Sequence, residues 1–257
     1  MTGILVEKAP PKLLITIDRP KANALDAEAS RGLGEVFTEF RDDTAYRVAI
    51  LTGAGDRFFC AGWDLKAAAE GERFDEDFGA GGFGGFQSLP DLNKPVICAV
   101  NGMAVGGGCE MLLAADLIVA ADHSELFMPE VFVGMIPDTG SVRLPRMIPP
   151  AIAKELLLTG RRLSAAEALE LGLVNLVVPG DRLMDAAHEM AEKIIEAAPL
   201  AVATVLDLIR RTQALDVEQS FALMPSVESY QKLVDSEDAV EGARAFVEKR
   251  APVWKGR

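Results

Sequence analysis

The sequence is poor in the residues that would place it in several large protein classes. Only three cysteines occur among 257 residues, an odd number that suits no disulfide framework. Their positions, Cys60, Cys98 and Cys109, match no zinc-binding or CxxC spacing, and each lies in an apolar stretch. We therefore expect three buried, reduced thiols in a cytoplasmic protein.

Basic residues and long apolar runs are also scarce. Lys and Arg number 26 against 39 Asp and Glu, which gives a formal net charge of −13. A surface of that sign repels nucleic acid and anionic membranes, so we expect neither as a partner. No apolar run is long enough to span a bilayer, and the first residues lack the basic-then-apolar order of a secretory signal.

Short apolar strands that alternate with helical segments are present instead. A helix is expected to begin near Asp26, a suitable N-cap, because the apolar residues that follow keep helical spacing. Continuous apolar strands between helices predict an α/β fold with its sheet covered on both sides. The expected strands are Ile4–Lys8, Lys12–Asp18, Val48–Gly53, Val96–Gly102, Leu117–Asp122 and Val174–Val178.

The chain beyond residue 150 reads as nearly all helix. Ser164 and Glu167 have the spacing of a capping box, and helices are predicted at 181–197, 200–212, 216–233 and 237–249. We place a boundary near residue 197, with a core at 1–197 and a helical segment at 198–257. Five glycines between Gly79 and Gly85 predict a mobile loop.

The run Gly106–Gly108 is followed by Glu110, and a second acidic turn comes at Pro129 and Glu130. Glycines at a helix start offer unshielded N–H groups to an oxygen that gains negative charge, although such runs often mark only close helix packing. A carboxylate in the first turn is also explained by the helix dipole. Brought together, however, two carboxylates can pass a proton or a water molecule between them.

A second loop, Phe58–Leu65, follows an expected strand and leads into a helix. Its small residues Ala61 and Gly62 would let backbone approach a ligand closely, and donors from two loops hold an oxygen better than one donor does. The chemistry predicted is proton abstraction beside a carbonyl, coupled to the addition or loss of water.

Five segments together resemble the crotonase (enoyl-CoA hydratase/isomerase) superfamily, in the right order and over essentially the whole chain. They are Asp18–Leu25, Cys60–Asp64, Asn101–Glu110, Ala115–Asp116 and Pro129–Glu130. The resemblance implies a spiral of ββα units, an acyl-CoA thioester substrate, and an enolate held between two backbone N–H groups. Carried onto this chain, those donors are the amides of Ala61 and Gly107, and the catalytic pair is Glu110 and Glu130.

The stretches Ala61–Glu72, Thr159–Arg162 and Glu248–Arg257 look like the carnitinyl-CoA dehydratase branch, which interconverts L-carnitinyl-CoA and crotonobetainyl-CoA. The hypothesis assigns the C2 proton to Glu130 and the water to Glu110. It implies no cofactor, since coenzyme A is part of the substrate. The helical segment of similar proteins forms trimers or dimers of trimers, so a homotrimer or a hexamer is expected.

Two departures from the family pattern bear on specificity. The segment Ile136–Pro145, which normally borders the acyl pocket, looks one residue shorter than usual and has Ser141 where a glycine is expected. Asp138 stands eight residues after Glu130, where dienoyl-CoA isomerases place an acid. A double-bond isomerase and a non-catalytic acyl-CoA-binding scaffold therefore remain alternatives.

Further candidates for substrate binding are Lys21, Gly62, Trp63, Asp64 and Asp138. An aromatic face can hold a quaternary ammonium, and Trp63 is considered for that role. Phe83 and Phe86 are expected instead to pack in the core or in a lid. No residue pattern indicates a metal site.

Overall fold

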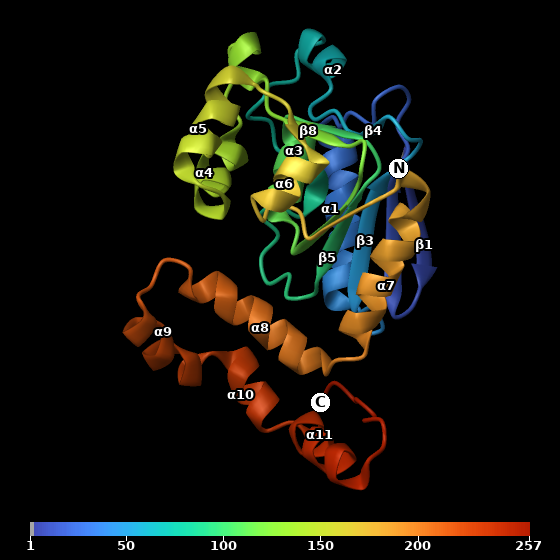
Figure 1. Cartoon of the computed structure of the whole chain (residues 1–257), viewed down its shortest axis with the longest axis vertical. Coiled ribbons are helices and arrows are strands. Elements are labelled where there is room, and N and C mark those ends of the chain that lie inside the picture. The colour runs from blue at the N-terminus through green and yellow to red at the C-terminus, as the bar shows by residue number, and fades with distance from the viewer. Residues whose placement is uncertain (1–2) are drawn as a thin grey trace. The chain divides into compact units, whose positions relative to one another are not determined.

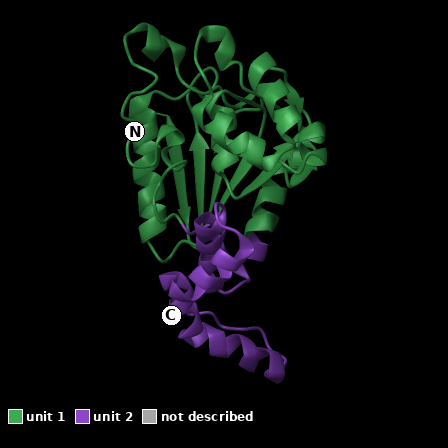
Figure 2. Cartoon of the chain, turned by 90° about the vertical axis from the view of Figure 1, so that its left-hand side faces the viewer, with its two compact units in different colours: residues 1–92, 96–191 green, residues 93–95, 192–257 purple. Residues whose placement is uncertain are grey.

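The computed structural model describes residues 3–257, which form two compact units (Figure 2). The first contains the N-terminal part of the chain to Leu92 and Val96–Ala191, and the second contains Asn93–Pro95 and Glu192–Arg257. The sequence predicted a boundary near residue 197, just before Pro199. The two units meet between Ala191 and Glu192, inside one continuous helix, α7 (Leu183–Ile195).

The first unit is built around a six-stranded sheet with the order β1-β2-β3-β5-β7-β10 (Figure 1). Only the β1–β2 pair is antiparallel, and every other neighbouring pair is parallel. All six strands were expected from the sequence. Their bounds are β1 Ile4–Ala9, β2 Lys12–Ile17, β3 Val48–Gly53, β5 Val96–Val100, β7 Leu117–Ala121 and β10 Leu176–Val178.

A second sheet of four short strands was not expected, because strands of two or three residues carry too little periodicity. Its order is β4-β6-β8-β9, with bounds β4 Phe58–Cys60, β6 Met103–Val105, β8 Glu125–Phe127 and β9 Leu163–Ser164. The parallel pairs β4–β6 and β6–β8 bring the ends of three separate segments to one edge. The loop after Cys60, the glycine run after Val105 and the turn after Phe127 therefore meet there.

The helix α1 (Ala27–Asp42) begins where the sequence predicted. The carboxylate of Asp26 caps it by accepting a hydrogen bond from the amide of Ala29 at 2.8 Å. Its apolar side chains Leu33, Phe37 and Phe40 are fully buried in the core of the unit. The three cysteines are likewise free and buried, as expected.

Further helices of the first unit surround the short sheet. They are α2 Leu65–Ala69, α3 Gly107–Ala114, α4 Asp138–Met147, α5 Pro150–Thr159 and α6 Ala165–Glu170, with short 3-10 turns η1 Phe83–Gly85, η2 Glu130–Val133 and η3 Gly180–Arg182. The glycine-rich stretch that ends in η1 is tightly packed rather than open. A side chain on Gly85 would collide with Leu33 and the amide of Gly34 in α1, so the expectation of a mobile loop is wrong.

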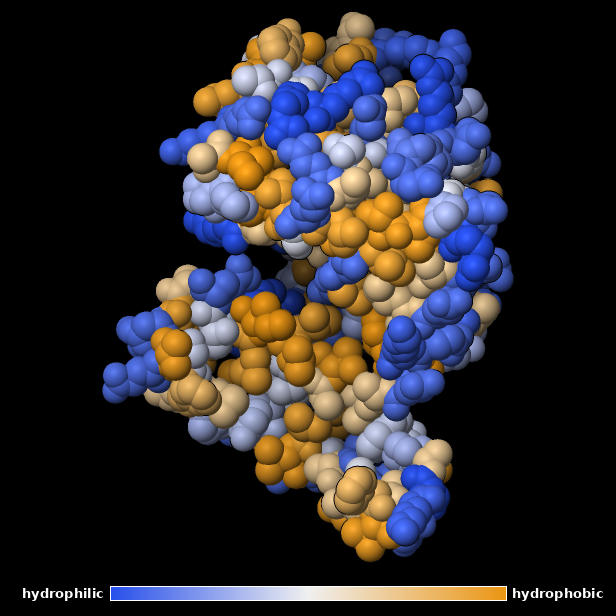
Figure 3. All heavy atoms as spheres, in the orientation of Figure 1, coloured by the Kyte–Doolittle hydropathy of each residue, from blue (hydrophilic) through white to orange (hydrophobic). Residues whose placement is uncertain are grey.

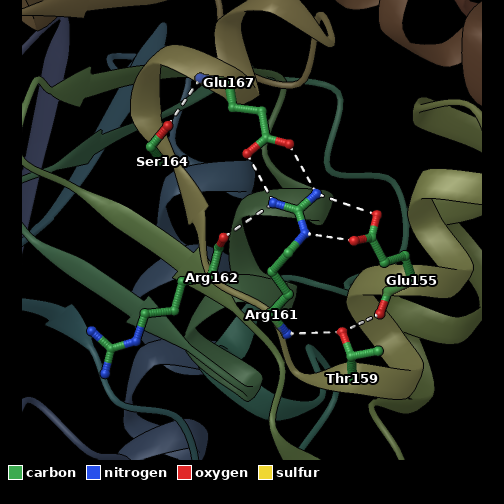
Figure 4. Close-up of polar contacts among 6 residues, drawn as sticks. All are labelled: Glu155, Thr159, Arg161, Arg162, Ser164 and Glu167. Atoms are coloured by element: carbon green, nitrogen blue, oxygen red, sulfur yellow. Dashed lines mark hydrogen bonds and ion pairs between the residues drawn. The ribbon is translucent and has the colours of Figure 1, made fainter.

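A network around Arg161 joins α5 to α6 (Figure 4). Its guanidinium donates to both carboxylate oxygens of Glu167 at 2.9 Å and to Glu155 at 3.1 Å. Ser164 caps α6 by accepting from the amide of Glu167 at 3.2 Å. The predicted capping box is thus half formed, because the Glu167 side chain binds Arg161 instead of the backbone of Ser164.

The second unit is helical, as predicted. After α8 (Pro199–Thr212), the single helix expected at 216–233 is divided into α9 (Val217–Leu223), the 3-10 turn η4 (Met224–Ser226) and α10 (Glu228–Val234). Pro225 lies at the division, where its ring is incompatible with a continuous helix. The last helix is α11 (Glu237–Glu248). Among residues 3–257, no helix combines the length and apolar character needed to cross a membrane.

Candidate active site

The glycine run places two acidic side chains beside each other. Gly106, with φ of +56°, turns the chain from β6 into α3, and its amide donates to the carbonyl of Phe127 at 2.9 Å. A Cβ atom on Gly106 would lie 2.9 Å from Oε1 of Glu130. Because Gly106 has no side chain, the Glu130 carboxylate has room beside the start of α3, the helix that contains Glu110.

Glu110 and Glu130 line one cavity of about 670 Å³ in the first unit. Gly107, Trp63 and Asp138 line the same cavity, so five of the residues expected at the site meet there. The other lining residues are Phe74, Asp75, Glu76, Phe78, Gly82, Phe83, Gln87, Ser88, Met135, Ile136, Thr139, Val142 and Arg143.

The two carboxyl groups have different environments. Glu110 is almost fully buried, and its Oε1 accepts a hydrogen bond from the amide of Gly140 at 2.8 Å. Burial raises the pKa of Glu110 to about 8, with a further contribution from the nearby carboxylates of Asp138 and Glu130. At neutral pH the Glu110 carboxyl therefore holds a proton.

Burial also raises the pKa of Glu130. Its Oε2 is buried and has no hydrogen-bond partner among the described residues. Glu130 lines the cavity, and a carboxylate oxygen without a hydrogen-bond partner has the capacity to accept a proton. The cavity thus holds two carboxyl groups with different hydrogen-bond partners.

The backbone donors differ from the predicted pair. The amide of Ala61 donates to the carbonyl of Ala22 at 3.0 Å, so Ala61 is not available to a ligand and that assignment is wrong. Trp63 forms a parallel bridge with Leu25, in which the amide of Leu25 donates to Gly62 and Leu25 accepts from Asp64. In such a bridge the N–H of the central residue, here Trp63, points to the opposite edge of the segment.

Trp63 and Gly107 both line the cavity, and within residues 3–257 neither amide donates to another protein atom. The two amides come from adjacent loops. A Cβ atom on Gly62 would lie 2.9 Å from the Gly107 nitrogen and 2.7 Å from the carbonyl of Val105. Close backbone packing and the exposure of N–H donors therefore occur together here. The glycine run can thus serve both close helix packing and the binding of an oxygen, the two interpretations that its sequence allowed.

Three expected binding residues lie outside the cavity lining. Lys21 is exposed, Gly62 is buried in the loop contact, and Asp64 caps α2 by accepting from the amide of Lys66 at 2.9 Å. A hydrogen bond fixes the orientation of the Trp63 indole, since its Nε1 donates to Glu72 at 2.6 Å. The Glu72 carboxylate in turn accepts from the amide of Ala27 at the start of α1.

Sequence reasoning missed the aromatic side of the cavity. Phe83 was expected to pack in the core or in a lid, yet it lines the cavity, and a Cβ atom on Gly107 would lie 2.6 Å from its ring. Phe78 meets Phe83 edge to face with ring centroids 5.6 Å apart. Phe86 does pack in the core, against Phe37 at 4.7 Å. The signal that could have found Phe74 and Phe78 is the presence of two phenylalanines, four residues apart, in an otherwise charged stretch over 72–78.

No cluster of three or more His, Cys, Asp and Glu side chains suited to a metal ion occurs in the part of the chain that the structure describes. Burial raises the pKa of the nearby Cys60 thiol to about 12, so this cysteine is a neutral packing residue.

Comparisons with known proteins place this geometry in context. The profile of the enoyl-CoA hydratase/isomerase family matches residues 12–257. Carnitinyl-CoA dehydratase of Proteus mirabilis is 56% identical over 248 residues, which cover 95% of each chain. Carnitinyl-CoA dehydratase of Citrobacter koseri is 55% identical over 250 residues, or 96% of each chain. The crystal structure of an enoyl-CoA hydratase from Mycobacterium tuberculosis superposes with a TM-score of 0.91 at 44% identity, over 100% of both chains.

Proposed function

The chain belongs to the enoyl-CoA hydratase/isomerase family, with the crotonase fold, and from this premise we propose that it is a hydro-lyase. The reaction adds or removes water across the C2–C3 bond of an enoyl-CoA thioester. One observation supports it above the others: Glu110 and Glu130, in different environments, face one cavity beside two unoccupied backbone donors.

In this mechanism the thioester oxygen accepts hydrogen bonds from the amides of Trp63 and Gly107. These donors stabilise the charge that develops when the C2 proton leaves. Glu130 accepts that proton, and Glu110 gives its own proton to the hydroxyl group at C3, which departs as water. Afterwards Glu130 is protonated and Glu110 is ionised, the state from which hydration runs in reverse.

The substrate we propose is L-carnitinyl-CoA, with crotonobetainyl-CoA as the dehydrated product. The relatives that share more than half of their residues with this chain are named for that activity, over nearly their full length. The acyl pocket is large enough for a branched acyl end.

The test uses a panel of enoyl-CoA substrates with and without the trimethylammonium group. Hydration of each substrate is measured as the loss of absorbance of its conjugated thioester. We expect hydration of crotonobetainyl-CoA at a rate well above that of crotonyl-CoA. Absence of hydration of every member would contradict the proposal, and equal rates would contradict the choice of substrate.

A double-bond isomerase is the second candidate, because Asp138 lines the cavity and its charge contributes to the raised pKa of Glu110. An acid there could return a proton to a carbon further along the acyl chain. Product analysis in isotopically labelled water separates the two: a hydratase places labelled oxygen at C3, whereas an isomerase incorporates no oxygen.

We also propose, as in similar proteins, that the chain assembles in the cytoplasm as a trimer or a dimer of trimers through its second unit. Apolar side chains gather over α8 in Figure 3, and Val205 and Ile209 are exposed residues of this helix. An exposed apolar surface of this kind is typical of a subunit contact. Sedimentation analysis of the full chain tests the proposal, and a monomer would contradict it.

A further inference from the structure

The lining of the cavity has an unusual composition for an acyl pocket. The cavity is lined by five carboxyl side chains, Asp75, Glu76, Glu110, Glu130 and Asp138, but by only one cationic side chain, Arg143. Three phenylalanines, Phe74, Phe78 and Phe83, lie along the same cavity. Carboxylates combined with aromatic faces are the groups that hold a cation without hydrogen bonds.

Resting on the proposed function, we infer that Phe78, Phe83 and Glu76 form a subsite for a quaternary ammonium group at the end of the acyl chain. Phe83 contacts the site of Gly107, whose amide faces the thioester oxygen, and Phe78 extends the aromatic surface by 5.6 Å from ring centroid to ring centroid. In an extended trimethylammonio-butenoyl chain, the nitrogen lies about 5 Å from the carbonyl carbon. The cation therefore reaches this aromatic pair.

Glu76 supplies the charge of the subsite. Asp75, its neighbour, is paired with Arg73 at 2.7 Å, which reduces its attraction for a ligand. Glu76 lines the cavity and makes no ion pair among the described residues, and Arg73, which binds Asp75, acts on Glu76 only through its charge. A carboxylate near the rim attracts a cation at long range, while the rings hold its methyl groups after water has left.

The positive charge of Arg143 repels a cation, but the carbonyl groups that bind its guanidinium reduce this repulsion. The guanidinium donates to the carbonyl of Leu113 at 3.2 Å and to the carbonyl of Gln87 at 2.9 Å. Leu113 lies in the last turn of α3, where the helix dipole is negative. The side-chain amide of Gln87 is buried with no hydrogen-bond partner. Arg143 and Gln87 together would suit an anionic acyl end, and the experiment must separate this possibility.

The experiment measures binding to the full-length protein by calorimetry, so that it does not depend on turnover. The probes are saturated thioesters that cannot react: trimethylammonio-butanoyl-CoA, its neutral isostere with a tert-butyl group, and glutaryl-CoA, which ends in a carboxylate. We expect the cationic probe to bind roughly 3- to 30-fold more tightly than the neutral one. In a merely apolar pocket the neutral probe binds more tightly, because the cation loses more hydration.

Two variants assign the residues. Phe78→Leu keeps an apolar side chain but removes the ring, and should lower the cation preference about threefold or more. Glu76→Gln removes only a charge from an exposed side chain, and should lower the preference and reduce its dependence on salt. Glu70→Gln is the matched control: the same change in an exposed glutamate of the same segment, outside the lining of this cavity, should leave the ratio unaltered.

Equal affinities of the two isosteres, tighter binding of glutaryl-CoA, or a ratio unchanged in both Phe78→Leu and Glu76→Gln would overturn the subsite. Its failure is distinct from failure of the proposed function. A cation preference without hydration of crotonobetainyl-CoA would contradict the hydro-lyase function and support the subsite. Hydration without a cation preference would support the hydro-lyase function and contradict the subsite.

Discussion

The two walls of the cavity differ in how strongly the backbone constrains them. The reaction wall carries Trp63, Gly107, Glu110 and Glu130, and a Cβ atom on the adjacent Gly62 or Gly106 would meet neighbouring atoms within 3 Å. In the acyl wall, by contrast, large apolar side chains are open, with Ile136 67% exposed and Phe74 66% exposed. The reaction wall therefore has one conformation, while side chains of the acyl wall can be exchanged.

This difference separates chemistry from specificity. Main-chain donors and buried carboxyls must be held within a fraction of an ångström to act on a transition state. An acyl group requires only a surface of suitable shape and charge. Substitutions should accordingly lower the turnover number in the first wall, and change mainly the Michaelis constant in the second.

The largest effect is expected for Glu130→Gln in the reaction wall. The amide keeps the shape but cannot accept the C2 proton, so kcat should fall about 10²- to 10⁴-fold. Steady-state kinetics on the preferred enoyl-CoA measure it, with the exposed Glu35→Gln in α1 as a control of the same chemistry. Near-normal turnover would remove Glu130 from the mechanism.

Gly62→Ala should come next. The new methyl group would force the Trp63 loop away from Gly107, and loss of a donor from such a site lowers kcat about 10²- to 10³-fold. Gly55→Ala is a matched control, since Gly55 has a similar φ of +80° but nothing within 4 Å of the added atom. The control should lose only about 1–2 kcal/mol of unfolding free energy through backbone strain, with kcat retained.

The pH dependence tests the buried acid of the reaction wall. Dehydration needs a protonated Glu110 and an ionised Glu130, so kcat should fall tenfold per pH unit above about pH 8, and should also fall at acid pH as Glu130 takes up a proton. Because the folded pKa lies above the usual value of 4.5, stability declines as pH rises from about 4.5 to 8. Thermal unfolding of Glu110→Gln should lack this decline, and an unchanged decline would assign it to another group.

The smallest effect is expected in the acyl wall. Ile136→Ala removes an exposed side chain, so KM should rise less than about tenfold while kcat is retained. Leu5→Ala, a similar change of an exposed residue in β1 away from the cavity, should leave both constants unaltered. A large fall of kcat in Ile136→Ala would contradict the proposal that substitutions in the acyl wall change mainly the Michaelis constant.

Much of the fold could be predicted from local patterns. The six strands of the large sheet, the start of α1 after Asp26 and the helical C-terminal part follow from apolar spacing and N-cap residues within a few positions. The short sheet and the break at Pro225 were missed. A strand of three residues exists only through its partners, and the apolar period ran on across Pro225.

For the site, the sequence by itself determined the reacting groups: two glutamates, a glycine run at a helix start, and a glycine in a facing loop. Only the tertiary structure decided which amide is free, because the pairing of residues 22–25 with residues 61–64 occupies Ala61 and leaves Trp63 available. It also decided that Glu110 keeps its proton and that Phe78 and Phe83 face the cavity. Each of these depends on contacts between segments distant in the chain, which no local pattern encodes.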